Sequence, residues 1–310
     1  MDKILVAGST VADVIIRVGR LPPRGGDVNI ETEEIQLGGC AYTVARAIIK
    51  ALAGSGLGCR LCSPVGAGVY GDFVAGALAK EGIEPFVRVP EENGCCYCLV
   101  EADGERTFLC RRGAEYRFQP SWFQALPSEE AVAFRAAFVC GIDLDTPVLA
   151  DYLIYLTKKA RREKRQWTLY FAPGSRWEDI ADETLTAMFA AHPFLHLSEG
   201  EAFGLTACSD VQTAAERLYQ KTENSLVITL GKDGAYYREK DGEASRGGGH
   251  FVPAEAMSAP NTVGAGDTHC GALIAALERG IALPEAVREA NRAAGEYLIA
   301  HSVSGVSSEA

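Results

Sequence analysis

The sequence predicts an α/β protein whose mostly parallel sheet is covered by helices on both faces and carries a small lid of β-strands. Three observations lead to this fold class: the short strands are apolar almost throughout, segments of helical periodicity separate them, and two stretches alternate with period two instead. Strands buried on both faces form continuous apolar runs, and helices cross between parallel neighbours. Such sheets bind ligands beyond the carboxyl ends of their strands.

Strands and helices alternate from the first residues onward. Residues 4–8 form an apolar strand ending in glycine, and residues 41–53 carry apolar side chains at helical spacing. The next strand and helix are expected at 60–65 and 70–80. Further along the chain, the same patterns predict strands at 136–140, 167–171, 194–197 and 226–230 and a helix at 147–161.

Two segments, 14–37 and 86–112, break this rhythm and are predicted to form the lid. The first alternates with period two around a turn rich in proline and glycine. The second has alternating strands on either side of Asp103-Gly104, which is a hairpin signal. Both are expected to be antiparallel and to cover a ligand crevice. The chain shows no repeat or interdomain linker, so residues 1–310 are predicted to be a single domain with this lid inserted.

Composition and charge argue against several classes of function. A net charge of -11 does not suit a nucleic-acid surface. No apolar stretch approaches the roughly 20 residues of a membrane helix, so no membrane association is expected. No secretory signal follows Met1, so the ten cysteines indicate reduced thiols and a cytoplasmic protein. Their spacing does not match a zinc site, and buried apolar thiols are expected.

Residues 261–268, Asn-Thr-Val-Gly-Ala-Gly-Asp-Thr, carry the strongest chemical signal. Gly264, Ala265 and Gly266 allow backbone N–H groups to face a bound anion where a helix begins. A carboxylate beside that site would repel a phosphate, so Asp267 is predicted to be the general base for a hydroxyl that attacks a phosphoryl group. No Walker-type phosphate loop is present. His269 points about 200° away from Asp267 on a helix and is expected to pack in the core.

Two loci near the N-terminus are candidates for binding the acceptor. Asp13 follows the first strand and would accept hydrogen bonds from two vicinal hydroxyls of a sugar, or it forms a turn. Gly38 and Gly39 open a helix and permit a ligand to approach the backbone, and Thr43 offers a hydroxyl. A flexible helix start is the alternative for the glycines.

A third locus lies where the strand at 226–230 enters a turn. Thr229 ends this strand, and Gly231 and Gly234 follow it. Glycine at this place would let a nucleotide lie against the backbone. An ordinary hairpin turn is the alternative.

Taken in order, these residues resemble the PfkB family of ribokinase-like carbohydrate kinases, and most of all a subgroup of uncharacterised sugar kinases. The segment from Val6 to Asp13 resembles the family's first strand with its sugar-binding aspartate. Residues 38–43 and 261–267 fall on its two signatures, and residues 290–294 on its late helix near the adenine. The resemblance implies a three-layer α/β/α core with a β lid, ATP as donor, Mg2+, and an alcohol acceptor, often a sugar or a nucleoside.

The resemblance also implies roles for individual residues. Glu201 would position Mg2+ through water, and Asn291 would lie near the adenine. The implied catalytic residues are Asp267, Gly264, Ala265 and Gly266, the implied substrate-binding residues are Asp13, Gly38, Gly39 and Thr43, and the implied cofactor-binding residues are Ser198, Glu201, Thr229, Gly231, Gly234 and Asn291.

Three positions depart from the family pattern. Asn261 stands where an aspartate tied to a monovalent cation is usual, which weakens any prediction of K+. Thr43 replaces an asparagine that commonly contacts the sugar. Ser198 replaces the asparagine of an Asn-x-x-Glu motif, whereas Glu201 is kept.

The sequence therefore predicts an ATP-dependent kinase that phosphorylates a hydroxyl of a small sugar or related polyol. One alternative is a nucleoside kinase of the same fold, with Tyr97, Phe108 and Tyr116 as candidates for a base pocket. Another is a non-catalytic sensor of sugars or nucleotides, suggested by the three departures. A homodimer through the lid strands is a further hypothesis.

Overall fold

The computed structural model of the chain describes residues 3–124, 134–240, 249–254 and 264–302. Tertiary contacts divide the chain into two compact units. The first unit contains residues 1–7, 43–60 and 119–310, and the second contains residues 8–42 and 61–118. Each unit has a sheet and buried side chains of its own.

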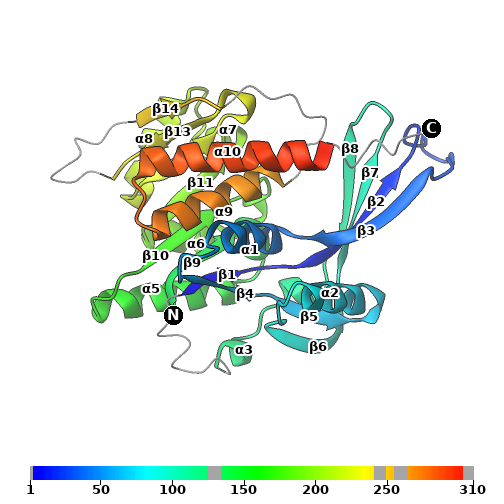
Figure 1. Ribbon diagram of the computed structural model, residues 1–310, viewed down its shortest axis with the longest axis horizontal. Helices are drawn as coiled ribbons and strands as arrows, with labels where there is room; N and C mark the ends of the chain where they lie inside the picture. Colours follow the sequence, from blue (N-terminus) through cyan, green and yellow to red (C-terminus); the bar gives the residue numbers. More distant parts are fainter. Residues whose placement is uncertain (1–2, 125–133, 241–248, 255–263, 303–310) are drawn as a thin grey trace. The chain divides into compact units, whose positions relative to one another are not determined.

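The first unit is built on an eight-stranded sheet (Figure 1) with the order β14-β13-β12-β11-β10-β9-β1-β4. The neighbouring strands β1, β9, β10, β11 and β12 pair in parallel. At one edge of the sheet, β13 pairs antiparallel with both β12 and β14. This confirms the predicted, mostly parallel sheet. The strands are β1 (Lys3–Ala7), β4 (Gly58–Cys62), β9 (Phe134–Cys140), β10 (Thr168–Ala172), β11 (Phe194–Ser198), β12 (Leu226–Thr229), β13 (Ala235–Arg238) and β14 (Gly249–Val252).

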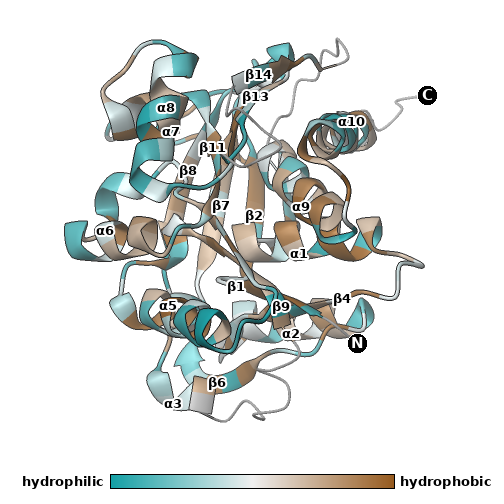
Figure 2. Ribbon diagram, turned by 90° about the vertical axis from the view of Figure 1, so that its left-hand side faces the viewer, coloured by the Kyte–Doolittle hydropathy of each residue, from teal (hydrophilic) through white to brown (hydrophobic). Residues whose placement is uncertain are grey.

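Helices cover both faces of this sheet, as Figure 2 shows. One face carries α5 (Pro147–Arg162), α6 (Asp182–Ala190), α7 (Glu199–Thr206) and α8 (Val211–Thr222). The other carries α1 (Cys40–Ala51), α9 (Ala265–Glu278) and α10 (Leu283–Ser302), and a short helix, α3 (Pro120–Gln124), packs near α5. Central strands such as β9 are buried along nearly their whole length because helices shield them on both sides. None of the helices in the described ranges is long and apolar enough to cross a bilayer.

The second unit contains a four-stranded sheet with the order β3-β2-β7-β8. Its hairpin at Asp103-Gly104 is confirmed, because Gly104 has a φ of 88° and its N–H donates to the Glu101 carbonyl at 2.9 Å. A separate two-stranded sheet joins β5 and β6, and a helix, α2, packs on β5. The bounds are β2 (Val11–Arg17), β3 (Thr32–Gly38), β5 (Pro64–Ala67), α2 (Gly68–Lys80), β6 (Val87–Glu92), β7 (Cys95–Val100) and β8 (Arg106–Arg111).

One expectation about the strands was wrong. The strand expected at 60–65 is broken in two, since β4 joins the large sheet and β5 the small one. Pro64 stands at the break, where its missing N–H cannot continue a ladder. The expectation that each lid segment forms antiparallel strands is confirmed, and the two segments are joined by a parallel pairing of β2 with β7.

Candidate active site

In the first unit, two of the polar loci predicted from sequence lie at the carboxyl ends of neighbouring parallel strands. Ser198 ends β11 and leads into α7, and Thr229 ends β12 and leads into a short 3-10 turn at Gly231–Asp233. Since β11 and β12 pair in parallel with Ser198 opposite Thr229, the two loops leave the same edge of the sheet. This is the edge at which α/β sheets bind ligands.

The start of α9 has the geometry of an anion site. Gly264 is the residue before the helix and adopts a φ of 82°, a left-handed conformation that favours glycine. A Cβ at this position would lie 2.5 Å from the Tyr297 hydroxyl oxygen, which is a second reason for glycine. Because the N-cap residue is a glycine, it offers no side chain that could accept a hydrogen bond from the first N–H groups of the helix. The N–H groups at Ala265 and Gly266 begin the helix, where N–H groups have no intrahelical partner.

Asp267 lies in the first turn of α9 and is half-buried. The Cys270 thiol is buried one turn further along α9, and the charges that act on it identify side chains in its surroundings. Burial raises the pKa of Cys270 well above its ordinary value, and negative charge on Asp267, Cys140 and Glu201 raises it further. Asp267 and Glu201 are therefore both within electrostatic range of one thiol, although 66 positions separate them in the sequence.

Glu201 is held in place by a capping box at the start of α7. The Ser198 hydroxyl accepts a hydrogen bond from the Glu201 N–H at 3.4 Å, and the Glu201 carboxylate accepts one from the Ser198 N–H at 3.2 Å. Burial raises the pKa of Glu201, and hydrogen bonds from Ser198 and from the Gly174 backbone oppose that rise. Ser198 thus orients Glu201, a role that its Ser-x-x-Glu spacing indicates and that the sequence analysis missed.

The two glycines after β12 differ in what surrounds them. Gly234 has a φ of 107°, and a Cβ there would lie 2.2 Å from the Val252 carbonyl oxygen, so packing against β14 accounts for this glycine. Gly231 has a φ of 59° and open space where a Cβ would be. The turn does join β12 and β13 as a hairpin. Only Gly231 of this pair therefore leaves room for a ligand at the backbone.

His269 is 3% exposed, which confirms the prediction that it packs in the core. It belongs to a buried chain of polar contacts: His196 Nε2 is 2.9 Å from His269 Nδ1, and His269 Nε2 is 3.1 Å from Asn291 Oδ1. The Asn291 amide nitrogen donates to the carbonyls of Val252 and Pro253, at 3.2 and 3.3 Å. The sequence analysis did not anticipate His196, because one histidine inside an apolar strand carries no local signal.

These contacts assign the protons. The Asn291 nitrogen is the donor to two carbonyls, so its oxygen must accept, and His269 Nε2 must carry a hydrogen. His269 Nδ1 then accepts from His196 Nε2, with both rings neutral. Burial lowers the pKa of His269 to about 4 and that of His196 well below its ordinary value. These polar contacts join α9 to β11 and α10. The Asn291 amide is hydrogen-bonded to His269 and to two backbone carbonyls. A contact between Asn291 and adenine therefore stays a prediction.

In the second unit, Asp13 lies on β2 beside the glycine pair. A Cβ on Gly38 would lie 1.8 Å from Asp13 Oδ2, and a Cβ on Gly39, whose φ is 97°, would lie 2.6 Å from the Ser9 carbonyl oxygen. Gly38 thus makes room for the Asp13 carboxylate, and Gly39 makes room for the Ser9 backbone. Both glycines lie where the chain enters α1, and Thr43 follows in the first turn of that helix. Burial raises the pKa of Asp13 to about 6. Burying an ionised carboxylate costs folding free energy, and carboxyl groups with raised pKa values are common at functional sites.

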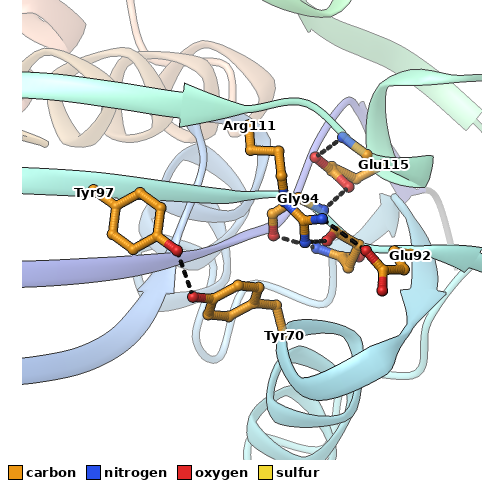
Figure 3. A network of polar contacts seen from close by, with 8 residues as sticks. Tyr70, Glu92, Gly94, Tyr97, Arg111 and Glu115 are labelled. Atoms are coloured by element: carbon orange, nitrogen blue, oxygen red, sulfur yellow. Dashed lines mark hydrogen bonds and ion pairs between the residues drawn. The ribbon is translucent and has the colours of Figure 1, made fainter.

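Arg111 is engaged in hydrogen bonds within the second unit. Its guanidinium donates to the Glu92 carboxylate at 2.7 Å (Figure 3). It also donates to the Asn93 carbonyl at 3.0 Å. In the same network the buried Glu115 accepts from the N–H groups of Gly94 and Gly113, at 2.7 and 2.9 Å. These hydrogen bonds join the C-terminal end of β8 to Glu92 and the N-terminal end of β7 to Glu115.

Two other predictions about sites concern cysteine and Asn261. No group of three or more metal-binding side chains occurs among residues 3–124, 134–240, 249–254 and 264–302. Asn261, with the expectation about K+, lies outside the described residues. The predicted acceptor residues Asp13, Gly38 and Gly39 belong to the second unit, and Thr43 and the predicted phosphate residues belong to the first.

The chain is similar to known proteins along nearly its whole length. The profile described as "pfkB family carbohydrate kinase" matches residues 1–308. The chain belongs to the PfkB family of carbohydrate kinases. Its family relatives include the uncharacterised sugar kinase YegV of Escherichia coli strain K12, which is 30% identical over 97% of this chain and 89% of that protein.

Solved structures of the family share the fold. The ribokinase of Thermotoga maritima has a TM-score of 0.80 at 20% identity, covering 96% of this chain and 93% of that one. A ribokinase of Cryptococcus neoformans var. grubii serotype A, solved in complex with ADP, has a TM-score of 0.72 at 20% identity, covering 96% and 94%. At this identity the likeness shows the ribokinase fold and leaves the acceptor open.

Proposed function

We propose that this PfkB-family kinase transfers the terminal phosphoryl group of ATP to a hydroxyl of a small sugar or related polyol. The observation that carries the proposal is the start of α9, where Gly264 in a left-handed conformation precedes the helix and Asp267 follows in its first turn. The N–H groups of Ala265 and Gly266 would stabilise charge that develops on the transferred group. Asp267 would take the proton of the attacking hydroxyl. The ADP complex of the similar fungal ribokinase supports an adenine nucleotide as donor.

Glu201 fits the magnesium ion that the family implies. Its carboxylate supplies the hard oxygen atoms that Mg2+ prefers, and the Ser198 N–H already orients one of them. Mg2+ typically keeps several waters and binds through one or two carboxylates together with phosphate oxygens, so one protein carboxylate such as Glu201 would be sufficient. When bound, Mg2+ would neutralise charge on the ATP phosphates. The part played by Glu201 itself is to hold a water molecule at a defined place.

Replacing Glu201 by glutamine is expected to raise the Mg2+ concentration required for half-maximal activity by about 10-fold or more, because residues that orient metal-bound groups commonly contribute 10- to 100-fold in affinity. Glutamine can still accept from the Ser198 N–H, so the helix cap is kept. Glu199→Gln is the matched control, since Glu199 is exposed in the same turn. Titrating Mg2+ at saturating ATP measures both variants. An unchanged Mg2+ requirement in Glu201→Gln contradicts the role.

The acceptor is tested with the purified chain, ATP, Mg2+ and a panel of sugars, polyols and nucleosides, with the phosphorylated product identified by mass spectrometry. A phosphorylated sugar or polyol is the expected result. Preference for nucleosides would make the chain a nucleoside kinase. Binding of sugar or ATP without any product would make it a sensor. Either of these two outcomes overturns the proposal.

The aromatic residues named for a nucleoside base pocket are not equally placed for it. Tyr97 donates or accepts a hydrogen bond with Tyr70 at 2.8 Å (Figure 3). Since Asp13 pairs with Cys96, Tyr97 points to the opposite face of the sheet from Asp13. Tyr116 is buried, with 8% of its surface exposed. Phe108 on β8 is 49% exposed, so it is the most accessible of the three aromatic side chains. Homodimerisation through the strands of this sheet stays a hypothesis.

A further inference from the structure

Two cysteines face each other across the hairpin of the second unit. Cys96 on β7 pairs directly with Cys110 on β8, and their sulfur atoms are 2.9 Å apart. On its other side, Cys96 pairs with Asp13 on β2. Directly paired residues point to the same face of a sheet, so the two thiols and the Asp13 carboxylate share one face.

The geometry of this pair suits a disulfide. Directly opposed residues of an antiparallel pair have Cα atoms about 4.5 or 5.5 Å apart, and disulfides join Cα atoms about 4.4–6.8 Å apart. The bonded sulfur atoms are about 2.05 Å apart, so the Sγ atoms of Cys96 and Cys110 need to approach by about 0.9 Å from their 2.9 Å separation. Rotation of the side chains is sufficient for this and leaves the strand register intact.

The neighbouring cysteines do not compete for the same bond. Cys98 shares the face but pairs with Phe108, so it lies diagonal to Cys110, at a distance of about 7–8 Å for such pairs. Cys95 alternates to the opposite face and is 1% exposed. Cys96 is thus the single thiol of β7 placed to bond with Cys110.

We propose that Cys96 and Cys110 are a site of reversible oxidation, and that a peroxide converts them to a cross-strand disulfide. The Cys110 sulfur attacks one peroxide oxygen, an S–O bond forms, and the O–O bond breaks. The thiol proton leaves with the departing oxygen as water. The Cys96 sulfur then attacks the Cys110 sulfur, the S–S bond forms, the S–O bond breaks, and a second water carries away the Cys96 proton. Two thiols lose two electrons and two protons, and hydrogen peroxide becomes two waters.

The order of the two steps follows from exposure and charge. Cys110 is exposed on β8, which is an edge strand of its sheet, so an oxidant can reach it. Burial raises the pKa of Cys96, and its hydrogen bond with Cys110 and the nearby Asp13 raise it further. Cys96 is therefore the resolving thiol. Disulfides that are exposed or strained are readily reduced again, which makes the site reversible.

The test treats the native full-length chain with hydrogen peroxide, blocks remaining thiols with an alkylating reagent, and maps tryptic peptides. Trypsin cuts after Arg88, Arg106 and Arg111, so Cys96 lies in peptide 89–106 and Cys110 in peptide 107–111. The expected result is a linked pair of these peptides, with Cys95 and Cys98 alkylated, that is lighter by two hydrogen atoms than the sum of the two peptides carrying the same two alkyl groups. The linked pair should disappear on treatment with a thiol reductant. Because the map needs no kinase activity, it stands or falls separately from the proposed function.

Single substitutions assign the bond. Cys96→Ser and Cys110→Ser are each expected to abolish the linked pair, whereas Cys95→Ser and Cys98→Ser retain it. Circular dichroism confirms that each variant is folded. The proposal is overturned if folded wild-type chain accumulates higher oxides of Cys110 or links other peptides without forming this pair. Retention of the linked pair in Cys96→Ser overturns it as well.

Discussion

Replacing Asp267 with asparagine is expected to lower kcat by about 10²- to 10⁴-fold, the usual contribution of a general base. Asparagine has nearly the same shape but cannot take the proton of the attacking hydroxyl. Affinity for ATP should change little, because the groups proposed to hold the transferred phosphoryl are backbone N–H groups of Ala265 and Gly266, which the substitution keeps. Steady-state kinetics and a separate ATP-binding titration measure the two effects.

Asp210→Asn is the matched control for Asp267. Asp210 is also an aspartate at the start of a helix of the first unit, where it accepts from the N–H groups of Gln212 and Thr213 at 3.1 and 3.0 Å. Asparagine caps helices equally well, so kcat should stay at the wild-type value. Near-normal turnover in Asp267→Asn would contradict the general-base assignment, provided that thermal melting shows both variants folded.

Replacing Asp13 with asparagine is expected to harm activity and to stabilise the fold. Charged hydrogen bonds to substrate hydroxyls contribute about 1.5–3 kcal/mol each, so kcat/KM for the acceptor should fall by about 100-fold or more, with KM for ATP unchanged. Stability should rise because burial raises the pKa of Asp13 from 3.8 to about 6. A shift of this size corresponds to up to about 3 kcal/mol of folding free energy.

The sign of the effect on stability depends on pH. Below about pH 4 the carboxyl is protonated in the folded and the unfolded chain, so Asp13→Asn and wild type should unfold with equal free energies. As pH rises from about 4 to about 6, the unfolded chain ionises first and wild type loses stability, so the advantage of the variant grows and then stays constant. Urea titrations at several pH values measure it.

Asp27→Asn is the control for Asp13, since Asp27 is exposed in the same unit. Its free energy of unfolding should follow that of wild type at every pH. If Asp13→Asn showed the same stability difference at pH 4 and pH 8, the ionised Asp13 would not be the source of the cost. If kcat/KM for the acceptor were unchanged, Asp13 would not bind it.

Local signals accounted for much of the fold and for part of the candidate site. The Asp103-Gly104 hairpin followed from turn chemistry alone, because glycine tolerates the positive φ that this turn requires. The helix at α9 and its Gly264 followed from the same logic. The break at Pro64 was missed: the apolar run continues across the proline, and only the choice of partner strand separates β4 from β5. Which strand pairs with which depends on contacts between distant segments.

By itself, the sequence determined the α/β class, because periodicity and turn chemistry are properties of neighbouring residues. The family and the short motifs that hold the candidate catalytic groups followed from the resemblance of those motifs, taken in order, to a known family. Tertiary structure decided how those groups are surrounded. It set Gly38 against the Asp13 carboxylate, brought Glu201 and Asp267 within range of Cys270, and joined His196 to His269. It also placed two cysteines face to face across β7 and β8. These contacts arise from strand pairing and helix packing, which bring together side chains that no local pattern relates.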